Sequence, residues 1–186
     1  MTNKKQKGWL LPVFALILAT MVCLLSACMD IEPTKEPKSD GSEIGSSSTN
    51  AETSKDNIFS LNETAVFDNI KVTATETKES NGTEFFKPES GNIFVGVKFT
   101  IENISSEDQS ISSLLLFDAY CDGVKCDYSF KANSVINEGS LDGTLSPGKK
   151  MIGYYAIEAS KDWKQISFEV KSDWMSNSKA GFVIEK

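Results

Sequence analysis

The sequence predicts an all-β fold, an antiparallel β-sandwich that follows a signal peptide and a disordered linker. Apolar and polar residues alternate with a period of two in several short runs between residues 60 and 186, which is typical of half-buried strands. Turn-forming residues separate these runs. No long segment has the 3.6-residue apolar spacing of an amphipathic helix. Short strands at this spacing favour a sandwich of two sheets.

The N-terminal segment has the features of a secretory signal. Three lysines precede an almost wholly apolar run over residues 9–25, and no acidic residue occurs before Asp30. The small residues Ser26 and Ala27 then precede Cys28. Positive charge, apolar core and small cleavage-site residues, in this order, define a secretory leader. The alternative is an uncleaved membrane anchor, for which the run is slightly shorter than the ~20 residues that span a bilayer.

The cysteine that follows the small residues makes this leader resemble a bacterial lipoprotein signal. The resemblance implies cleavage between Ala27 and Cys28 and attachment of diacylglycerol, and often a further acyl chain such as palmitate, to Cys28. Each buried methylene contributes ~0.8 kcal/mol, so two or three acyl chains anchor a protein stably. We therefore expect residues 1–27 to be removed and the protein to be held at the extracytoplasmic face of the cell membrane.

Composition excludes several functions for the mature chain. Loss of residues 1–27, with their three lysines, changes the formal net charge from −7 to −10. This acidic surface argues against nucleic acid or anionic lipid headgroups as partners, since both would be repelled. The sequence contains no histidine and no arginine, which excludes Ser-His and Cys-His nucleophile pairs and bidentate phosphate clamps. We expect no catalytic residues, no metal and no cofactor.

Residues 28–59 form the predicted tether. They are rich in Ser, Thr, Glu, Lys and Pro, and such a segment buries too little apolar surface to offset its ordering entropy. A flexible chain of this length has a root-mean-square reach of ~30 Å and spans ~100 Å when fully extended. We interpret the segment as a spacer between membrane and domain.

Residues 60–186 form the predicted domain, and its strands follow from the alternation. In the clearest run, Ile93, Val95, Val97 and Phe99 define one inner face. The predicted strands, in order, lie within 70–75, 93–101, 111–119, 151–157, 166–170 and 182–184, and turn signals occur at 81–82, 90–92, 122–123, 142–143 and 146–148. Residues 172–180 are predicted to be a loop or one irregular helical turn.

Three segments of the domain carry a resemblance to a known family: the strand GNIFVGVKFTIEN (91–103), residues 110–120 with the turn Asp122-Gly123, and LSPGKKMIGYYAIEASKDWKQISFEV (145–170). They resemble a family of uncharacterised immunoglobulin-like domains of bacterial lipoproteins, domain of unknown function family 4352, whose fold group includes immunoprotective extracellular proteins. This resemblance implies an immunoglobulin-like β-sandwich and carries no shared catalytic residues. Unlike antibody domains, the chain lacks a widely spaced cysteine pair around a buried tryptophan.

Cys121 and Cys126 are the thiols that remain after lipidation of Cys28 and removal of the leader. A hairpin that turns at residues 123–124 would place them directly opposite each other, and export permits disulfides. We therefore predict a structural disulfide. Free thiols, a redox-active pair and a zinc site are the alternatives; the four-residue spacing does not fit the redox motif, and zinc would need two further ligands.

Acidic and aromatic residues provide the remaining candidates. Asp118, Asp122 and Asp127 cluster around the hairpin, but their spacing matches no calcium loop, so we interpret them as solvated turn residues. Phe85, Phe86, Trp174 and Met175 fall in predicted connections and form a candidate recognition surface; the alternative is that they plug the ends of the sandwich. Trp163 is predicted to be in the core.

These observations predict a lipid-anchored binding module at the cell envelope. Its partners would be the membrane, through the lipid on Cys28, and an unidentified envelope protein or polymer. The alternative is a carboxylate-based enzyme, or enzyme accessory, that acts on envelope polymers. A third reading is a structural lipoprotein of a membrane complex.

Overall fold

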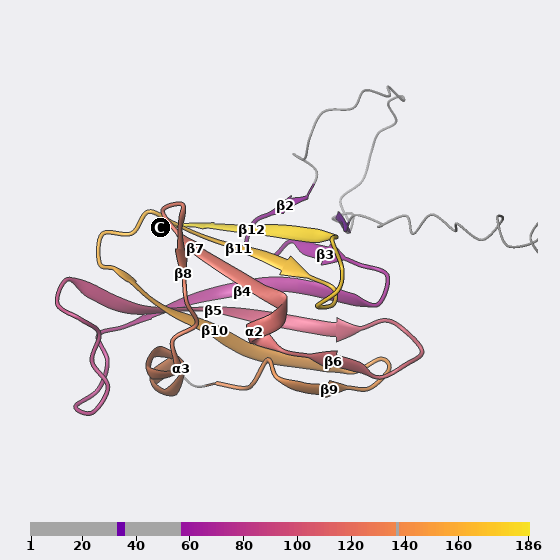
Figure 1. The fold of residues 1–186 in the computed structure, drawn as a ribbon, viewed down its shortest axis with the longest axis horizontal. Coiled ribbons are helices and arrows are strands. Elements are labelled where there is room, and N and C mark those ends of the chain that lie inside the picture. Colours follow the sequence, from indigo (N-terminus) through magenta and orange to yellow (C-terminus); the bar gives the residue numbers. More distant parts are fainter. Residues whose placement is uncertain (1–32, 36–56, 137) are drawn as a thin grey trace, which may run out of the picture.

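The computed structural model describes residues 33–35, 57–136 and 138–186, and they form two facing five-stranded sheets (Figure 1). The all-β prediction is confirmed. The first sheet has the strand order β1-β3-β4-β5-β10 and the second the order β2-β12-β11-β7-β8. A further two-stranded sheet, β6-β9, flanks them.

The first sheet is built on three long antiparallel strands. Their inner faces carry the predicted apolar alternation, which is longest in β5, where Ile93, Val95, Val97, Phe99 and Ile101 are all buried. The strands of this sheet are β1 (Thr34–Lys35), β3 (Thr64–Val66), β4 (Ile70–Ser80), β5 (Asn92–Asn103) and β10 (Lys150–Ser160). β5 pairs along its whole length with β10, from Asn92↔Ser160 to Glu102↔Lys150.

The second sheet covers the first through shorter strands. They are β2 (Ile58–Phe59), β7 (Phe117–Cys121), β8 (Val124–Cys126), β11 (Gln165–Lys171) and β12 (Lys179–Glu185). β2 runs parallel to β12 and every other pair is antiparallel. β11 and β12 alternate strictly between buried and more exposed residues, because one face meets the core and the other meets solvent.

The core between the sheets is centred on Phe99 of β5. Its ring makes edge-to-face contacts with Phe117, Phe168 and Phe182 of the second sheet, at centroid distances of 4.9, 5.1 and 5.7 Å. Trp163 is 3% exposed and belongs to the same core. Such aromatic contacts add about 0.5–1.5 kcal/mol per pair beyond area burial, and here they hold the two sheets together.

The predicted strand over residues 111–119 is interrupted by the short helix α2 (Ser113–Leu116). Before it lies β6 (Gln109–Ile111), which pairs with β9 (Gly143–Leu145), and after it comes β7. Asp142 accepts hydrogen bonds from the backbone N–H and the hydroxyl of Ser113, at 2.8 and 3.0 Å. The helical turn lets the chain pass from the small sheet to the second sheet, a crossing that period-two alternation does not reveal.

A second helix, α3 (Phe130–Ile136), covers part of the outer face of the first sheet. Ala132 and Ile136 pack with Phe94, Tyr154 and Ala156 in a small separate core. Gly96 of β5 makes room for this packing, since a β-carbon there would lie 2.9 Å from Ile136 Cγ2. The helix has only seven residues, too few to show a helical apolar stripe, and the sequence did not predict it.

The connections define two ends of the sandwich (Figure 1). We call them the near end and the far end, and the connections at each end identify them. The near end holds the β3–β4, β9–β10 and β11–β12 connections, and the far end holds the β4–β5, β7–β8 and β10–β11 connections. The C-terminal end of β12 belongs to the far end, because Lys186 Nζ lies 3.0 Å from Glu79 Oε1 near the end of β4. The β11–β12 connection, at the other end of β12, therefore belongs to the near end.

Two pieces of the predicted tether are part of the fold. β1 pairs with β3, and β2 pairs with β12, so the prediction of a structureless segment over residues 28–59 is wrong at these positions. The physical reason is burial, since Pro33 and Phe59 are both enclosed. The signal peptide (1–27), Cys28 and most of the tether lie outside the described residues. In the described part of the chain, no helix combines the length and apolarity needed to cross a bilayer.

Candidate binding surfaces

A β-bulge in β4 places charged side chains on the outer face of the first sheet. The pairing of β4 with β5 shifts between Ala74 and Glu76, so Thr75 is the extra residue. A bulge exchanges the two faces of a strand. Ile70, Val72 and Ala74 point into the core before it, whereas Glu76 lies opposite Lys98 on the outer face after it.

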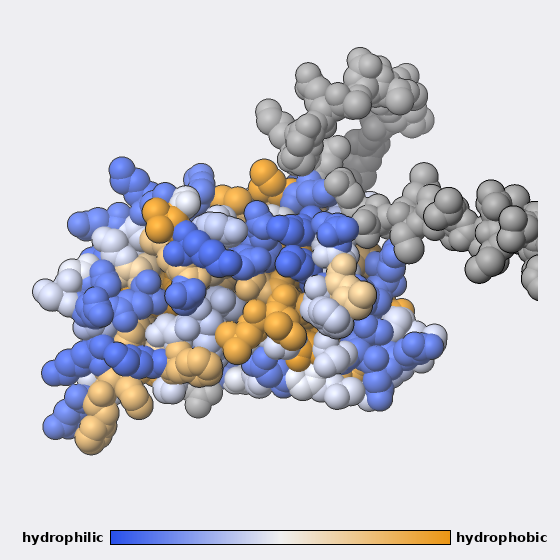
Figure 2. Space-filling model, in the orientation of Figure 1, coloured by the Kyte–Doolittle hydropathy of each residue, from blue (hydrophilic) through white to orange (hydrophobic). Residues whose placement is uncertain are grey.

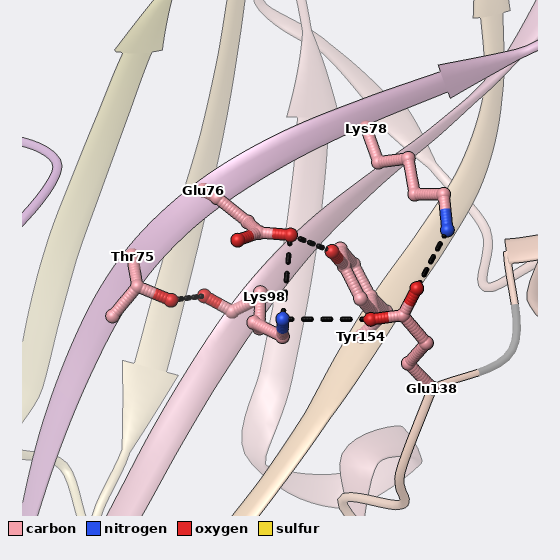
Figure 3. Close-up of polar contacts among 6 residues, drawn as sticks. All are labelled: Thr75, Glu76, Lys78, Lys98, Glu138 and Tyr154. Atoms are coloured by element: carbon pink, nitrogen blue, oxygen red, sulfur yellow. Dashed lines mark hydrogen bonds and ion pairs between the residues drawn. The ribbon is translucent and has the colours of Figure 1, made fainter.

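Around Lys98, four side chains from three segments of the chain form a connected polar network (Figure 3). Lys98 Nζ lies 3.3 Å from Glu76 Oε1 and 3.6 Å from Glu138 Oε2. Tyr154 donates its hydroxyl hydrogen to Glu76, and Lys78 Nζ lies 2.8 Å from Glu138 Oε1. The network ties β4, β5 and β10 to the segment that follows α3.

These contacts determine the protonation of the two carboxylates. The hydrogen bond from Tyr154, with one from Lys98, holds the pKa of Glu76 below its ordinary value. The hydrogen bond from Lys78 lowers the pKa of Glu138 in the same direction. A general acid needs a raised pKa near the working pH. Both carboxylates of this network therefore stay ionised at neutral pH, and they act as ion-pair partners on an open sheet face.

At the far end, the β4–β5 connection projects from the sandwich (Figure 1) and carries two exposed phenylalanines, which we call the aromatic tip. Phe85 is 86% exposed and Phe86 43%. The tip is held by a backbone hydrogen bond of 2.7 Å from Thr83 N to Phe86 O, and by one of 3.2 Å from Phe86 N to Thr83 Oγ1. Gly82 has a φ of +88°, the left-handed region that glycine adopts without strain. The phenylalanines are thus exposed on a braced turn.

The far end also contains an open depression of about 400 Å³ between the edges of the two sheets. Leu61, Trp163 and Ile184 form its apolar floor. Trp163 Nε1 donates to Glu79 Oε1 at 2.8 Å, and Lys186 Nζ lies 5.1 Å above the Trp163 ring. The depression therefore combines an apolar surface with a charged pair at its rim, which is the usual composition of a small binding site.

Trp174 and Met175 lie at the near end, in the β11–β12 connection. They are 69% and 72% exposed. Because the phenylalanine tip is at the far end, the four residues of the predicted recognition surface do not form one surface. Sequence alone could not show this separation, because strand connectivity decides at which end each connection emerges.

The prediction from sequence did not identify the exposed apolar pair Leu114 and Leu115 of α2, which are 57% and 61% exposed. Figure 2 shows an apolar area over α2 near the centre of the viewed face. Both leucines belonged to the predicted strand over residues 111–119, where they were assigned to a sheet. Their exposure follows from the helical turn at α2.

The cysteine hairpin differs from the prediction in its register. The turn is at Asp122-Gly123, so Cys121 pairs with Val124 and Cys126 pairs with Ala119. The cysteines are therefore diagonal neighbours on one face of the hairpin, and both are free thiols in this structure. Burial, followed by the charge of Asp122, raises the pKa of Cys121; burial also raises that of Cys126. Raised pKa values disfavour the thiolate needed for redox or zinc chemistry.

Two of the three acids beside this hairpin, Asp118 and Asp122, have partners within the domain. Asp118 Oδ1 lies 2.7 Å from Lys125 Nζ, and this hydrogen bond lowers the pKa of Asp118. Asp122 Oδ1 accepts backbone hydrogen bonds from Lys164 and Gln165 at 3.0 and 2.9 Å. Over the described residues, no group of three or more Cys, Asp or Glu side chains is placed to hold a metal ion.

The two facing sheets define the class of protein, a β-sandwich domain. The chain belongs to a family described as a domain of unknown function (DUF4352), whose model matches residues 59–180. No curated protein matches the sequence.

Solved structures with low sequence identity share this fold. The ycdA protein of Bacillus subtilis subsp. subtilis str. 168, named as a lipoprotein, is 13% identical with a TM-score of 0.53; the match covers 63% of this chain and 37% of ycdA. The yjhA protein of Bacillus subtilis is 14% identical with a TM-score of 0.51, over 68% of this chain and 97% of yjhA. The present chain thus spans just over a third of ycdA.

Proposed function

We propose that the protein is a lipoprotein anchored to the outer side of the cell membrane through Cys28, and that its β-sandwich is a non-catalytic binding module. The positive, apolar and small-residue order of the leader supports the anchor. The name of ycdA as a lipoprotein, on a similar fold, also supports it.

The aromatic tip at the far end carries the binding role. Phe85 is 86% exposed although two hydrogen bonds between Thr83 and Phe86 brace its turn. A braced turn keeps this ring in water, where it gains no burial, and exposed aromatic anchors are typical of interaction sites. The depression that contains Trp163, Glu79 and Lys186 lies at the same end. The partner we propose is an envelope protein or a cell-wall polymer.

Two observations support a non-catalytic role. The sequence has no histidine, so the most common proton shuttle at neutral pH is absent from it. The neighbouring carboxylates Glu76 and Glu138 share Lys98 as a partner and have lowered pKa values, which does not suit the acid of a glycosidase pair.

Photo-crosslinking in living cells tests this function. A photoreactive phenylalanine analogue at position 85 should give an adduct with an envelope protein or glycan polymer. The same analogue at Lys131, an exposed position on α3, is the matched control and should give none. Absence of a position-85 adduct from membrane-located protein would contradict the binding role. Turnover of an envelope polymer by the purified protein, abolished by Glu76→Gln, would show an enzyme instead.

A further inference from the structure

The strand β1 attaches the chain to the domain close to the anchor. Thr34 and Lys35 pair with Val66 and Ala65 at the edge of the first sheet. Lys35 Nζ lies 3.2 Å from Glu63 Oε2 and 5.3 Å from the centre of the Phe59 ring. An ion pair, a cation–π contact and the strand pairing therefore hold β1, and the adjacent Pro33 is buried.

This attachment reduces the maximal distance between the domain and the membrane. Thr34 is the sixth residue after Cys28, and six residues span at most about 20 Å when fully extended. The whole segment from Cys28 to Phe59 would allow about 100 Å. With lipid on Cys28, as the proposed function requires, β1 keeps the domain beside the bilayer.

The register of β1 shows which end faces the membrane. Thr34 is opposite Val66 and Lys35 is opposite Ala65, so the chain before Thr34 leaves toward the β3–β4 connection. This connection is at the near end. The β11–β12 connection is at the same end, because Lys186, which follows β12, reaches Glu79 at the far end.

The near end presents a braced turn with a tryptophan. Asp173 Oδ1 accepts a hydrogen bond of 2.7 Å from Met175 N, and Ser176 N donates to Asp173 O at 3.3 Å. Trp174 and Met175 nevertheless remain mostly exposed. Tryptophan favours the membrane–water interface, where its ring is buried and its N–H stays hydrated.

Two lysines lie at the base of this connection. Lys171 and Lys179 are directly paired across β11 and β12, and like charges in this position repel each other. Lys179 Nζ lies 2.6 Å from Glu169 Oε2 on the same sheet. Lipid phosphates at the level of the strand ends would be within reach of the Lys171 ammonium group when the exposed Trp174 enters the interface.

We propose that the β11–β12 connection is a membrane-contact site, in which Trp174 and Met175 enter the interfacial region of the phospholipid bilayer that holds the anchor. β1 provides the short tether that brings this end to the surface. The far end, with the phenylalanine tip, then points away from the membrane. The inference rests on the proposed lipid anchor.

Tryptophan quenching in vesicles tests the contact. Lipidated protein is reconstituted in phosphatidylcholine vesicles whose acyl chains carry bromine, which quenches nearby tryptophan. Trp9 is in the leader, so the mature chain contains Trp163 and Trp174. Trp163 is 3% exposed and should keep its emission, whereas Trp174 should be quenched. The Trp174→Phe variant should lose the quenched share, and Phe85→Ala, the matched control at the far end, should retain it.

Tether variants test the role of β1. A long Gly-Ser insertion between Asp30 and Ile31 should weaken the quenching, because the effective concentration of the loop at the surface falls with tether length. Lys35→Glu places a second carboxylate beside Glu63 and should have the same effect, while the protein still sediments with vesicles.

The outcomes distinguish the contact from the anchor. Protein that sediments with vesicles and shows bromolipid quenching lost in Trp174→Phe supports the contact. Protein that sediments with vesicles without any quenching overturns the contact and leaves the anchor intact. Protein that neither sediments nor incorporates labelled palmitate in cells overturns both.

Discussion

At the scale of single residues, the close approach of neighbouring atoms explains why two strand positions are glycine. Gly153 in β10 and Gly96 in β5 both lie in strands, where glycine packs poorly and costs entropy. A β-carbon at 153 would lie 2.7 Å from the backbone carbon of Ser140, and one at 96 would lie 2.9 Å from the side chain of Ile136. The two sites differ in whether the neighbour can move.

We predict that Gly153→Ala destabilises the protein more than Gly96→Ala. Backbone atoms cannot move aside, so Gly153→Ala should cost about 2–3 kcal/mol, near the upper part of the range for overpacking. Rotation of the Ile136 side chain should limit the cost of Gly96→Ala to about 1 kcal/mol. Urea unfolding of both variants measures the difference, and equal costs would contradict this explanation.

Asn103 is a fully buried polar residue that fixes the near end. Its Nδ2 donates to Glu107 O and to Leu145 O, both at 2.7 Å, and its Oδ1 accepts from Ser105 N at 2.9 Å. Asn103→Asp should cost at least about 2 kcal/mol, since a carboxylate would face two carbonyl oxygens. The exposed Asn81→Asp is the control, expected within about 0.5 kcal/mol of the parent. Thermal unfolding of both variants decides.

At the scale of elements, one β-bulge and two short helices determine which residues of the sandwich are exposed and which are covered. The bulge at Thr75 exposes Glu76, the turn at α2 exposes Leu114 and Leu115, and α3 covers part of an otherwise open sheet face. Each of these elements is too short to have a periodic sequence pattern. Their stability comes from contacts to the sheets, so they can be perturbed separately from the core.

We predict that Ala132→Glu releases α3 without unfolding the sandwich. Ala132 is fully buried against the first sheet, and a carboxylate there would lack a partner. Hydrogen exchange should show lost protection in α3 and unchanged protection in β11 and β12. Lys131→Glu, on the exposed side of the same helix, should change neither. Global loss of protection in Ala132→Glu would show that α3 is part of the main cooperative unit.

We still predict a disulfide between Cys121 and Cys126 in the exported protein, although both are free thiols in this structure. The two cysteines share one face of the hairpin, although diagonal strand positions are wider apart than a disulfide prefers. Mass spectrometry of unreduced protein from the cell surface should find a mass lower by two hydrogens than after reduction. Two alkylated thiols without prior reduction would refute the bridge.

At the scale of the whole molecule, the sandwich separates two exposed aromatic sites by its full length. The far end carries Phe85 and Phe86 and the near end carries Trp174 and Met175. An elongated domain with one contact site at each end can link a membrane to a partner outside it. Acidic side chains paired with lysines lie between these ends, and they determine the response of the molecule to pH.

We predict that stability falls as the pH drops from about 5 to 3. The folded-state pKa values of Glu76, Glu138 and Asp118 are depressed by hydrogen bonds from Tyr154, Lys78 and Lys125, respectively. Their stabilisation is present above the ordinary carboxyl pKa and is lost as the pH falls through the lower folded value. Thermal midpoints across this range measure the loss. Glu76→Gln should reduce the slope, and an unchanged slope would contradict its assignment.

The sequence by itself determined the class of fold. Strict alternation around residues 93–101, together with the turn residues, predicted strands, because one buried face imposes a period of two on each strand. The same local chemistry correctly assigned Trp163 to the core. Only tertiary structure decided how these strands are arranged in space. The pairing of Thr34 with Val66, the bulge at Thr75 and the helix over Gly96 depend on contacts between residues far apart in the chain. For the same reason, the sequence could name Phe85 and Trp174 as exposed candidates but could not place them at opposite ends, since strand connectivity and register fix where each connection emerges.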